Sequence, residues 1–511
     1  MTVHRILTAL LVPVVVLATA SGCTLFTSPT ATSTPSAEQV PAEYEPYYSQ
    51  QLVWEECGDG MQCTTATAPM DWDAPDPADD IELALVRHQA TGERLGSLFV
   101  NPGGPGASGW SLVHDSVDYA VDEDIQSSYD VIGWDPRGVG RSSAVECYGD
   151  DDLDEFLFGL PVAEVGTPEY VDEVTTSAKS FADACAANTG ELLAHVDTRS
   201  TVRDLDMLRA AVGDTSLNYL GYSYGSDIGA QYIDMFADRV GRVVLDGATD
   251  PTVSAFDVQL AQTEAFADAL RAYLADCLAG SECPFSGSVD DAIASIDTVL
   301  DRLDAAPLRG EDGRALTSAY LSTAITSALY DESYWVYLSQ AFDEVARGET
   351  ATTFLLADSY VDRDEDGNYR SNFFEAFFAI NCLDYPVETD PALLEQQAAA
   401  VAELDPLTDA DEVDALGDLV CAQWPYSFEG ELGPVEGSGA PPVLVVGTTG
   451  DPATPYEWAV SLSGQLESGV LVTFEGEGHI AYDSGDPCVV AAVDAYFVDG
   501  TVPEDGLTCA V

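Results

Sequence analysis

Apolar segments with the length of buried β-strands alternate with helical segments in the first half of this chain. The apolar segments cover residues 81–86, 97–100, 129–134, 217–221 and 242–245. Residues 201–212 and 226–236 carry apolar side chains at the three- and four-residue spacing of a helix. Strands that alternate with helices pair in parallel and carry the helices on the faces of the sheet. The pattern therefore predicts an α/β fold with a mostly parallel sheet.

A long helical stretch interrupts this alternation between residues 251 and 437. Apolar residues recur three and four positions apart within it, and the strand pattern returns at 442–447 and 470–474. We therefore expect one α/β domain in two parts, residues 44–250 and 438–511, with residues 251–437 inserted between them. The chain has 511 residues, of which 46% are hydrophobic, so it is long enough to bury a core of this size.

The N-terminal residues have the pattern of an export signal. His4 and Arg5 precede an apolar run, which ends in small residues directly before Cys23. This order predicts a signal peptide over residues 1–22. Cysteine directly after the small residues resembles a bacterial lipoprotein cleavage motif, which implies a lipid on Cys23 after cleavage. Simple secretion and an uncleaved membrane anchor are the alternatives, because Ala20 stands where lipoprotein cleavage motifs usually have Leu.

The segment that follows Cys23 is rich in Thr, Ser, Pro and Ala, so residues 23–43 are expected to form a flexible linker. A lipid on one residue holds a protein at a membrane surface without spanning the membrane. Beyond the signal, the sequence has no run of 18 apolar residues. The expected location is the outer face of a bacterial cell membrane, with membrane attachment only through the lipid on Cys23.

The cysteine count supports export of the protein. Of 11 cysteines, removal of Cys23 leaves an even number, and cysteines of exported proteins usually form disulfides. Spacing suggests Cys57–Cys63, Cys277–Cys283 and Cys488–Cys509, and it leaves Cys147–Cys185 and Cys382–Cys421, although the sequence alone does not fix this pattern. A zinc site is the alternative, but no CxxC pair or neighbouring histidine supports it.

The formal net charge of -71 restricts the possible partners. Such a surface repels phosphates, so no nucleic-acid partner is expected. Residues 362–367 match the start of a calcium-binding loop, but Phe373 stands where that loop requires Glu. A surface turn is therefore expected there, with a weak calcium site as the alternative. No cofactor and no catalytic metal are expected.

The segment Gly221-Tyr222-Ser223-Tyr224-Gly225 matches G-x-S-x-G between a predicted strand and a predicted helix. In that context the motif forms the sharp turn that carries the nucleophile of α/β-hydrolases. Glycines flank the turn because it leaves no room for larger side chains. We therefore expect the α/β-hydrolase fold, with Ser223 as the nucleophile and the helical insertion as a lid over it.

The catalytic base and acid follow from their order along the chain. Hydrolases of this fold place their triad in the order Ser, acid, His, and His479 is the only histidine after Ser223. Asp451 follows the predicted strand 442–447 and is expected to orient the imidazole of His479. Asp246 is the alternative acid, because it also ends a predicted strand.

Backbone N–H groups must stabilise the oxyanion of an acyl-transfer intermediate. Tyr224 directly follows the nucleophile, and the glycine-rich segment 101–106 follows the predicted strand 97–100. Because Pro105 has no N–H, the expected donors are the backbone groups of Tyr224 and Gly104.

The motifs at 101–106, 135–142, 221–225, 451–455 and 478–479 occur together in one order and spacing. In this respect the chain resembles the secreted tripeptidyl aminopeptidases of actinobacteria, which are α/β-hydrolases related to prolyl aminopeptidases. The resemblance covers about residue 44 to the C-terminus, and the segment Asn381-Cys382-Leu383-Asp384 supports it within the insertion. It implies a serine peptidase whose substrate is a peptide with a free N-terminus, cut to release short peptides.

A free α-amino group is cationic, so a carboxylate of the lid is expected to bind it. Asp384 is the candidate, because it lies in the family-like segment next to the expected disulfide at Cys382. A structural or solvated carboxylate is the alternative for this residue. Asp135 and Arg137 are expected to brace the loops beneath the active site. A carboxylesterase or lipase with the same triad is the alternative function, whereas a complete triad argues against a non-catalytic binding protein.

Overall fold

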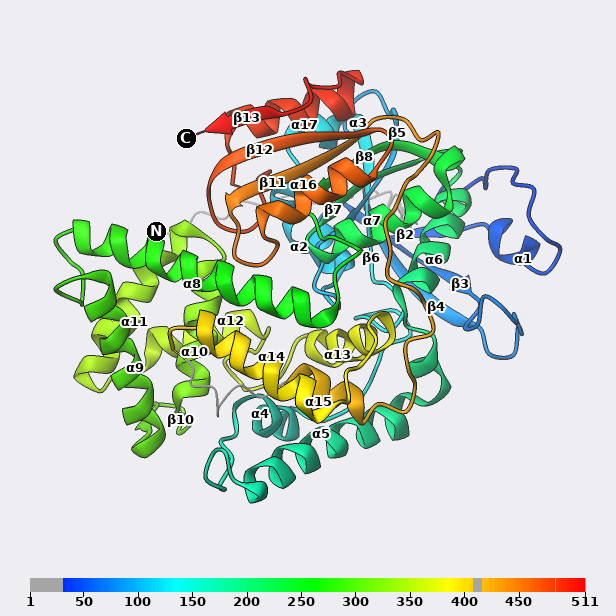
Figure 1. Cartoon of the computed structure of the whole chain (residues 1–511). Coiled ribbons are helices and arrows are strands. Elements are labelled where there is room, and N and C mark those ends of the chain that lie inside the picture. Colours follow the sequence, from blue (N-terminus) through cyan, green and yellow to red (C-terminus); the bar gives the residue numbers. More distant parts are fainter. Residues whose placement is uncertain (1–30, 408–415, 483, 511) are drawn as a thin grey trace, which may run out of the picture.

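The computed structural model describes residues 31–407, 416–482 and 484–510 (Figure 1). The predicted signal peptide and Cys23 lie outside the described residues. None of the described helices combines the length and the apolar character needed to cross a membrane.

One sheet of 11 strands organises the molecule, in the order β1-β2-β3-β4-β6-β5-β7-β8-β11-β12-β13. The pairs from β6 onward in this order are parallel, and the pairs before it are antiparallel. The strands are β1 (Ala31–Thr32), β2 (Val53–Gly58), β3 (Met61–Ala68), β4 (Ile81–His88), β5 (Gly96–Asn101), β6 (Tyr129–Trp134), β7 (Leu217–Tyr222), β8 (Val240–Asp246), β11 (Val443–Gly450), β12 (Gly469–Glu477) and β13 (Leu507–Ala510). The predicted parallel α/β sheet is confirmed, and the antiparallel hairpin β2–β3 and the edge strand β13 extend it.

Helices cover both faces of the sheet, because successive side chains of a strand point to opposite faces. In β11, Val443 and Val445 pack in one hydrophobic core, and Leu444 and Val446 pack in another. The first core includes residues of α6 (Thr198–Val212), α7 (Tyr224–Met235) and α16 (Tyr456–Gln465). The second includes residues of α2 (Gly109–Ala120), α3 (Glu123–Ser128) and α17 (Pro487–Asp499).

A group of helices inserted between β8 and β11 forms the second layer of the molecule (Figure 1). The helices are α8 (Ala255–Ala279), α9 (Val289–Ala305), α10 (Ser318–Leu329), α11 (Trp335–Arg347), α12 (Ala351–Tyr360), α13 (Phe373–Asp384), α14 (Pro391–Leu404) and α15 (Leu416–Ala422), with a small hairpin of β9 (Leu308–Arg309) and β10 (Ala315–Leu316). Leu274, Ile296, Leu321 and Leu338 belong to a hydrophobic core within this layer. The helical insertion predicted from the sequence is confirmed.

Two helices before α6 support this layer and were not anticipated from the sequence. They are α4 (Asp150–Phe158) and α5 (Pro168–Thr189), and Figure 1 shows them beside α13 and α15. Phe156 stacks on Phe181, with ring centroids 4.4 Å apart, and Phe378 of α13 lies edge-on to Phe181 at 5.5 Å. The insertion therefore rests on α4 and α5 as well as on the sheet.

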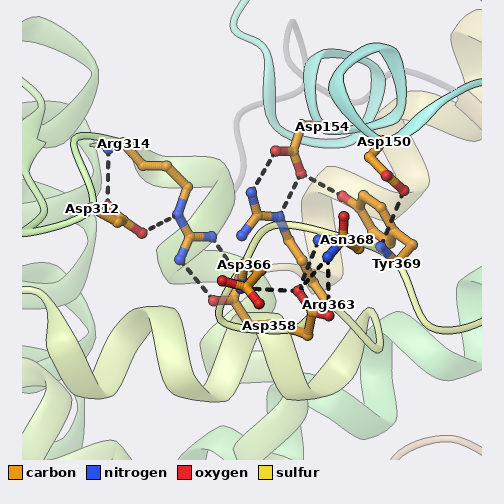
Figure 2. A network of polar contacts seen from close by, with 10 residues as sticks. Asp150, Asp154, Asp312, Arg314, Asp358, Arg363, Asp366, Asn368 and Tyr369 are labelled. Atoms are coloured by element: carbon orange, nitrogen blue, oxygen red, sulfur yellow. Dashed lines mark hydrogen bonds and ion pairs between the residues drawn. The ribbon is translucent and has the colours of Figure 1, made fainter.

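The acidic turn at residues 362–367 is held by hydrogen bonds (Figure 2). Arg363 donates to both carboxylate oxygens of Asp154 in α4, at 2.9 and 2.8 Å, and so links the insertion to α4. Oδ1 of Asp364 accepts from the backbone N–H of Asn368 at 2.9 Å. Within the part of the chain that the structure describes, the carboxylates of this turn do not form a cluster close enough to share an ion. The hydrogen bonds within this segment form the surface turn that the sequence predicts.

The segment at residues 31–43 differs from the flexible linker that its composition predicts. Ala31 and Thr32 pair with β2. Oε1 of Glu38 accepts from Nη1 of the buried Arg209 at 2.9 Å. The composition of this segment does not predict its order, because the order comes from partners elsewhere in the fold. The edge strand β2 offers unpaired backbone groups, and the buried guanidinium requires a carboxylate.

Five disulfides connect elements that are adjacent in the fold, and each pair matches the expectation from the sequence. They are Cys57–Cys63, Cys147–Cys185, Cys277–Cys283, Cys382–Cys421 and Cys488–Cys509. Cys382–Cys421 joins α13 to α15 inside the insertion, and Cys488–Cys509 joins α17 to the last strand. The predicted pairing is confirmed.

A fully buried ion pair supports the loops beneath the expected active site. Nε and Nη2 of Arg137 donate to the two carboxylate oxygens of Asp204, both at 2.7 Å. The same guanidinium donates to the backbone carbonyls of Pro69, Met70 and His195. This geometry agrees with the bracing role expected for Arg137.

We expect Arg137→Met to lower the free energy of unfolding by about 3–5 kcal/mol, because it leaves the Asp204 carboxylate buried without a counter-charge. Arg203→Met is the control, since Arg203 pairs with the exposed Asp73, and surface pairs contribute about 0–1 kcal/mol. Denaturant unfolding of both variants under oxidising conditions measures the difference. Equal losses in the two variants would contradict the bracing role.

Candidate active site

The turn between β7 and α7 places Ser223 in a backbone conformation that L-residues rarely adopt. Ser223 has φ 54° and ψ -127°, and its N–H donates to the backbone carbonyl of Asp246 at 2.9 Å. A Cβ atom on Gly221 would lie 2.3 Å from the carbonyl oxygen of Gly225, so only glycine fits there. Strain of this kind recurs at functional turns, and here it has the form of the nucleophile turn of α/β-hydrolases.

The loops after β11 and β12 bring Asp451 and His479 together. Nδ1 of His479 lies 2.9 Å from each carboxylate oxygen of Asp451. Asp451 is buried and also accepts hydrogen bonds from the backbone N–H groups of Ala453 and Thr454 and from Oγ1 of Thr454. These donors fix the orientation of the carboxylate, so that it can accept a hydrogen bond from Nδ1 of His479.

Asp246, the alternative acid, bonds to the backbone that follows the histidine. Its carboxylate accepts from the N–H groups of Ala481 and Tyr482 at 3.0 and 2.8 Å. Burial raises the pKa of Asp246 to about 6, although these two donors oppose the shift. The structure therefore brings Asp451 to the imidazole, and it brings Asp246 to the loop that carries the imidazole.

Ser223 and His479 line one cavity of about 860 Å³. Its walls come from the sheet edge and from α8, α10 and α13 of the insertion. Most of the lining is apolar, and it includes aromatic rings of Phe266, Tyr330, Tyr360, Phe373, Phe374 and Phe377. A volume of this size lies within the ~300–1,000 Å³ typical of small-ligand sites.

The glycine-rich loop after β5 lies directly against the serine turn. A Cβ atom on Gly103 would lie 2.7 Å from Cβ of Ser223 and 3.1 Å from the backbone nitrogen of Tyr224. The N–H of Gly103 already donates to Oδ1 of Asn101 at 2.9 Å. Gly104 and Tyr224 both line the cavity, and the N–H of Tyr224 lies in the first turn of α7, where helices leave their N–H groups unpaired. Gly104 and Tyr224 therefore both border the cavity that contains Ser223.

The insertion also contacts the histidine loop, which sequence reasoning missed. The backbone N–H of His479 donates to the carbonyl of Tyr330, at the end of α10, over 2.8 Å. The ring of Tyr330 lies edge-on to the imidazole, with centroids 5.4 Å apart. Gly478 has φ 102°, and a Cβ there would lie 3.0 Å from the same carbonyl. No periodicity in the sequence indicates this contact, because it joins segments about 150 residues apart in two layers.

Thr454 is a second residue that sequence reasoning missed. Its Oγ1 lies 2.9 Å from Oδ2 of Asp451 and 3.2 Å from Nδ1 of His479. The sequence offered one signal for Thr454, namely its position three residues after an Asp. A turn of that length returns the Thr hydroxyl to the carboxylate.

Asp384 does not line the cavity that contains Ser223, which is a correction to the expected role. Its Oδ1 accepts from the backbone N–H of Thr198 at 2.9 Å, and its Oδ2 accepts from Oγ1 of the same residue. Thr198 begins α6, whose positive N-terminal end favours a carboxylate. Asp384 lines a separate cavity of about 1170 Å³, and its contacts tie the end of α13 to the start of α6.

Comparison with known proteins places this architecture in one family. The fold is that of an α/β-hydrolase, and the family model described as TAP-like protein matches residues 405–509, which include Asp451 and His479. "Serine protease Hip1" of Mycobacterium tuberculosis is 35% identical over 484 residues, 91% of this chain and 92% of that protein. "Carboxylesterase B" of the same species is 37% identical over 494 residues, 94% of each chain. "Tripeptidyl aminopeptidase" of Streptomyces lividans is 31% identical over 474 residues, 90% of this chain and 86% of that protein.

The chain belongs to the tripeptidyl aminopeptidase family of α/β-hydrolases, and it is a serine hydrolase.

We expect Asp451→Asn to lower kcat by about 10³- to 10⁴-fold, because the amide no longer selects the correct tautomer of His479. Asp246→Asn should cost less than about tenfold, since the amide oxygen still accepts from the backbone of the histidine loop. Turnover of p-nitrophenyl acetate by both purified variants gives the ranking. The reverse ranking would transfer the role of the acid to Asp246.

Proposed function

We propose that this protein is a serine exopeptidase that releases short peptides, of tripeptide size, from the free N-terminus of peptides. The observation that carries the proposal is the cavity that holds Ser223 and His479 under the helical insertion. An open cleft would admit the middle of a polypeptide, whereas a lidded cavity admits a chain end. The name of the Streptomyces relative supports this reading.

In the proposed reaction, Oγ of Ser223 attacks the carbonyl carbon of the scissile bond. Nε2 of His479 takes the hydroxyl proton, and Asp451 stabilises the resulting imidazolium through Nδ1. The N–H groups of Gly104 and Tyr224 donate to the oxyanion. His479 then protonates the leaving amine, and a water molecule deprotonated by the same imidazole hydrolyses the acyl-enzyme.

A carboxylesterase is the second candidate function. One relative, 37% identical, bears the name carboxylesterase B, and an apolar cavity also accepts the acyl group of an ester. Ester turnover uses the same three side chains, so the triad does not distinguish the two functions. Turnover of an amide and an ester that carry the same acyl group distinguishes the two functions.

We propose that the chain is exported through a signal peptide at residues 1–22 and held at the outer face of the cell membrane by a lipid on Cys23. The motif before Cys23 and the disulfides in the folded part support export. Residues 44–250 and 438–511 are the proposed hydrolase core, and residues 251–437 are the proposed lid.

Ser223→Ala should reduce cleavage of a tripeptidyl amide to the rate of a blank while the circular-dichroism spectrum is unchanged, because no other group supplies the nucleophile. For each wild-type reaction, kcat/KM is divided by the rate constant of the uncatalysed reaction. This quotient should be higher for tripeptidyl amides than for short-chain esters of the same acyl group. Residual amide cleavage by the variant would remove Ser223 from its role. A strong preference for esters would favour the carboxylesterase.

Cys23→Ala should move the enzyme from the membrane pellet to the soluble fraction, because the variant has no site for the lipid. Its specific activity should stay unchanged, since the folded part is the same. Fractionation of cells that produce each form tests this. A variant that stays in the pellet would indicate an uncleaved membrane anchor.

A further inference from the structure

Only two carboxylates of the described residues line the cavity that contains Ser223, namely Asp250 and Asp405. The rest of the described lining has no Lys or Arg side chain, and it is mainly aromatic and aliphatic. In a protein of net charge -71, a cavity with so few acids has a limited number of places for a cation. The two carboxylates differ in what they already bind.

Asp250 is occupied by neutral donors of its own surroundings. Its Oδ1 accepts from N–H and Oγ1 of Thr252, at 2.9 and 2.7 Å, and from Nε2 of Gln465 at 2.9 Å. Although burial opposes it, hydrogen bonds from Ser461, Thr252 and Gln465 lower the pKa of Asp250. Asp250 is therefore committed to holding the loop after β8 against α16.

Among the residues that the structure describes, Asp405 has no such set of donors. It follows the last residue of α14, is half-buried, and accepts at Oδ1 from the N–H of Leu407 at 2.9 Å. No Arg, Lys or His of the described residues forms an ion pair with it, and residues 408–415, which follow, contain no basic residue. The C-terminal end of a helix carries negative partial charge, which disfavours a carboxylate there and favours a bound cation.

We infer that Asp405 binds the α-ammonium group of the peptide substrate. The inference rests on the proposed exopeptidase function and names the residue that reads the free N-terminus. An α-amino group with a pKa of about 8 is cationic at neutral pH, and a charge-assisted hydrogen bond is stronger in an apolar cavity than in water. With the ammonium held at Asp405 and the scissile carbonyl at Ser223, the separation of these two groups sets the number of residues released.

The separate acidic cavity offers the competing site. Asp227 and Asp384 are two of the several carboxylates that line it, and Tyr224, Thr249, Asn381 and Tyr385 line both cavities. Thr198 already occupies both oxygens of Asp384, and Nε2 of Gln231 donates to Oδ2 of Asp227. Asp405 is favoured because it shares a cavity with Ser223 itself.

The test compares Ala-Ala-Phe-aminomethylcoumarin with its N-acetylated form on wild-type enzyme and on Asp405→Asn. On the wild type, acetylation should lower kcat/KM at least tenfold, which corresponds to about 1.4 kcal/mol of lost binding. In Asp405→Asn, kcat/KM for the free amine should fall about tenfold, mainly through KM, so that the ratio between the two substrates approaches one. The ratio is independent of the fraction of active enzyme, so partial misfolding does not mimic the effect.

Two variants serve as controls for charge. Glu403→Gln removes an exposed carboxylate of the same helix and should keep the wild-type ratio. Asp405→Glu should restore part of the preference, because it restores the charge. A wild-type enzyme that cleaves both substrates equally would overturn the exopeptidase itself. A wild-type preference that survives in Asp405→Asn would overturn only this inference, and loss of the preference in Asp227→Asn instead would place the ammonium in the acidic cavity.

Discussion

The geometry of the parallel sheet is the constraint on which the rest of this molecule depends. In β7, β8, β11 and β12, which are parallel, the carboxyl ends lie at one edge, so the loops that follow them must meet there. Ser223, Asp451 and His479 each come after one of these strands, and Asp246 is the last residue of β8. Pairing of these strands in the correct order therefore brings the side chains of the candidate site together.

The insertion does more than cover this edge. Its carbonyl at Tyr330 accepts from the backbone of His479, and Phe373 at the start of α13 lies against the glycine-rich loop, where a Cβ on Gly104 would approach its ring to 3.0 Å. The insertion therefore contacts both the histidine loop and the loop that carries the proposed oxyanion donors. Its position is fixed in turn by α4, α5 and the Arg363–Asp154 pair, so these two helices are part of the site's support.

Charge is distributed unevenly between the surface and the interior. The buried cations serve the fold: Arg137 pairs with Asp204, and Arg209 pairs with Asp206 and Glu38. The cavity that holds Ser223 is mainly apolar despite the strongly acidic chain. An ammonium group that enters it meets a low-dielectric surrounding, in which one carboxylate has a large effect on binding.

The sequence by itself determined the α/β class, the serine turn and the order of Ser223, Asp451 and His479, because these depend on local periodicity, turn sterics and chain order. It favoured Asp451 and left Asp246 as the alternative acid, and only the paired sheet shows which carboxylate reaches the imidazole. It also offered Asp384 as the substrate carboxylate, with a structural role as the alternative, and it predicted a linker over residues 23–43. The tertiary structure decided otherwise, because a carboxylate's partner and a polar segment's order depend on groups far away in the chain: Thr198 lies 186 positions from Asp384, and Arg209 lies 171 positions from Glu38.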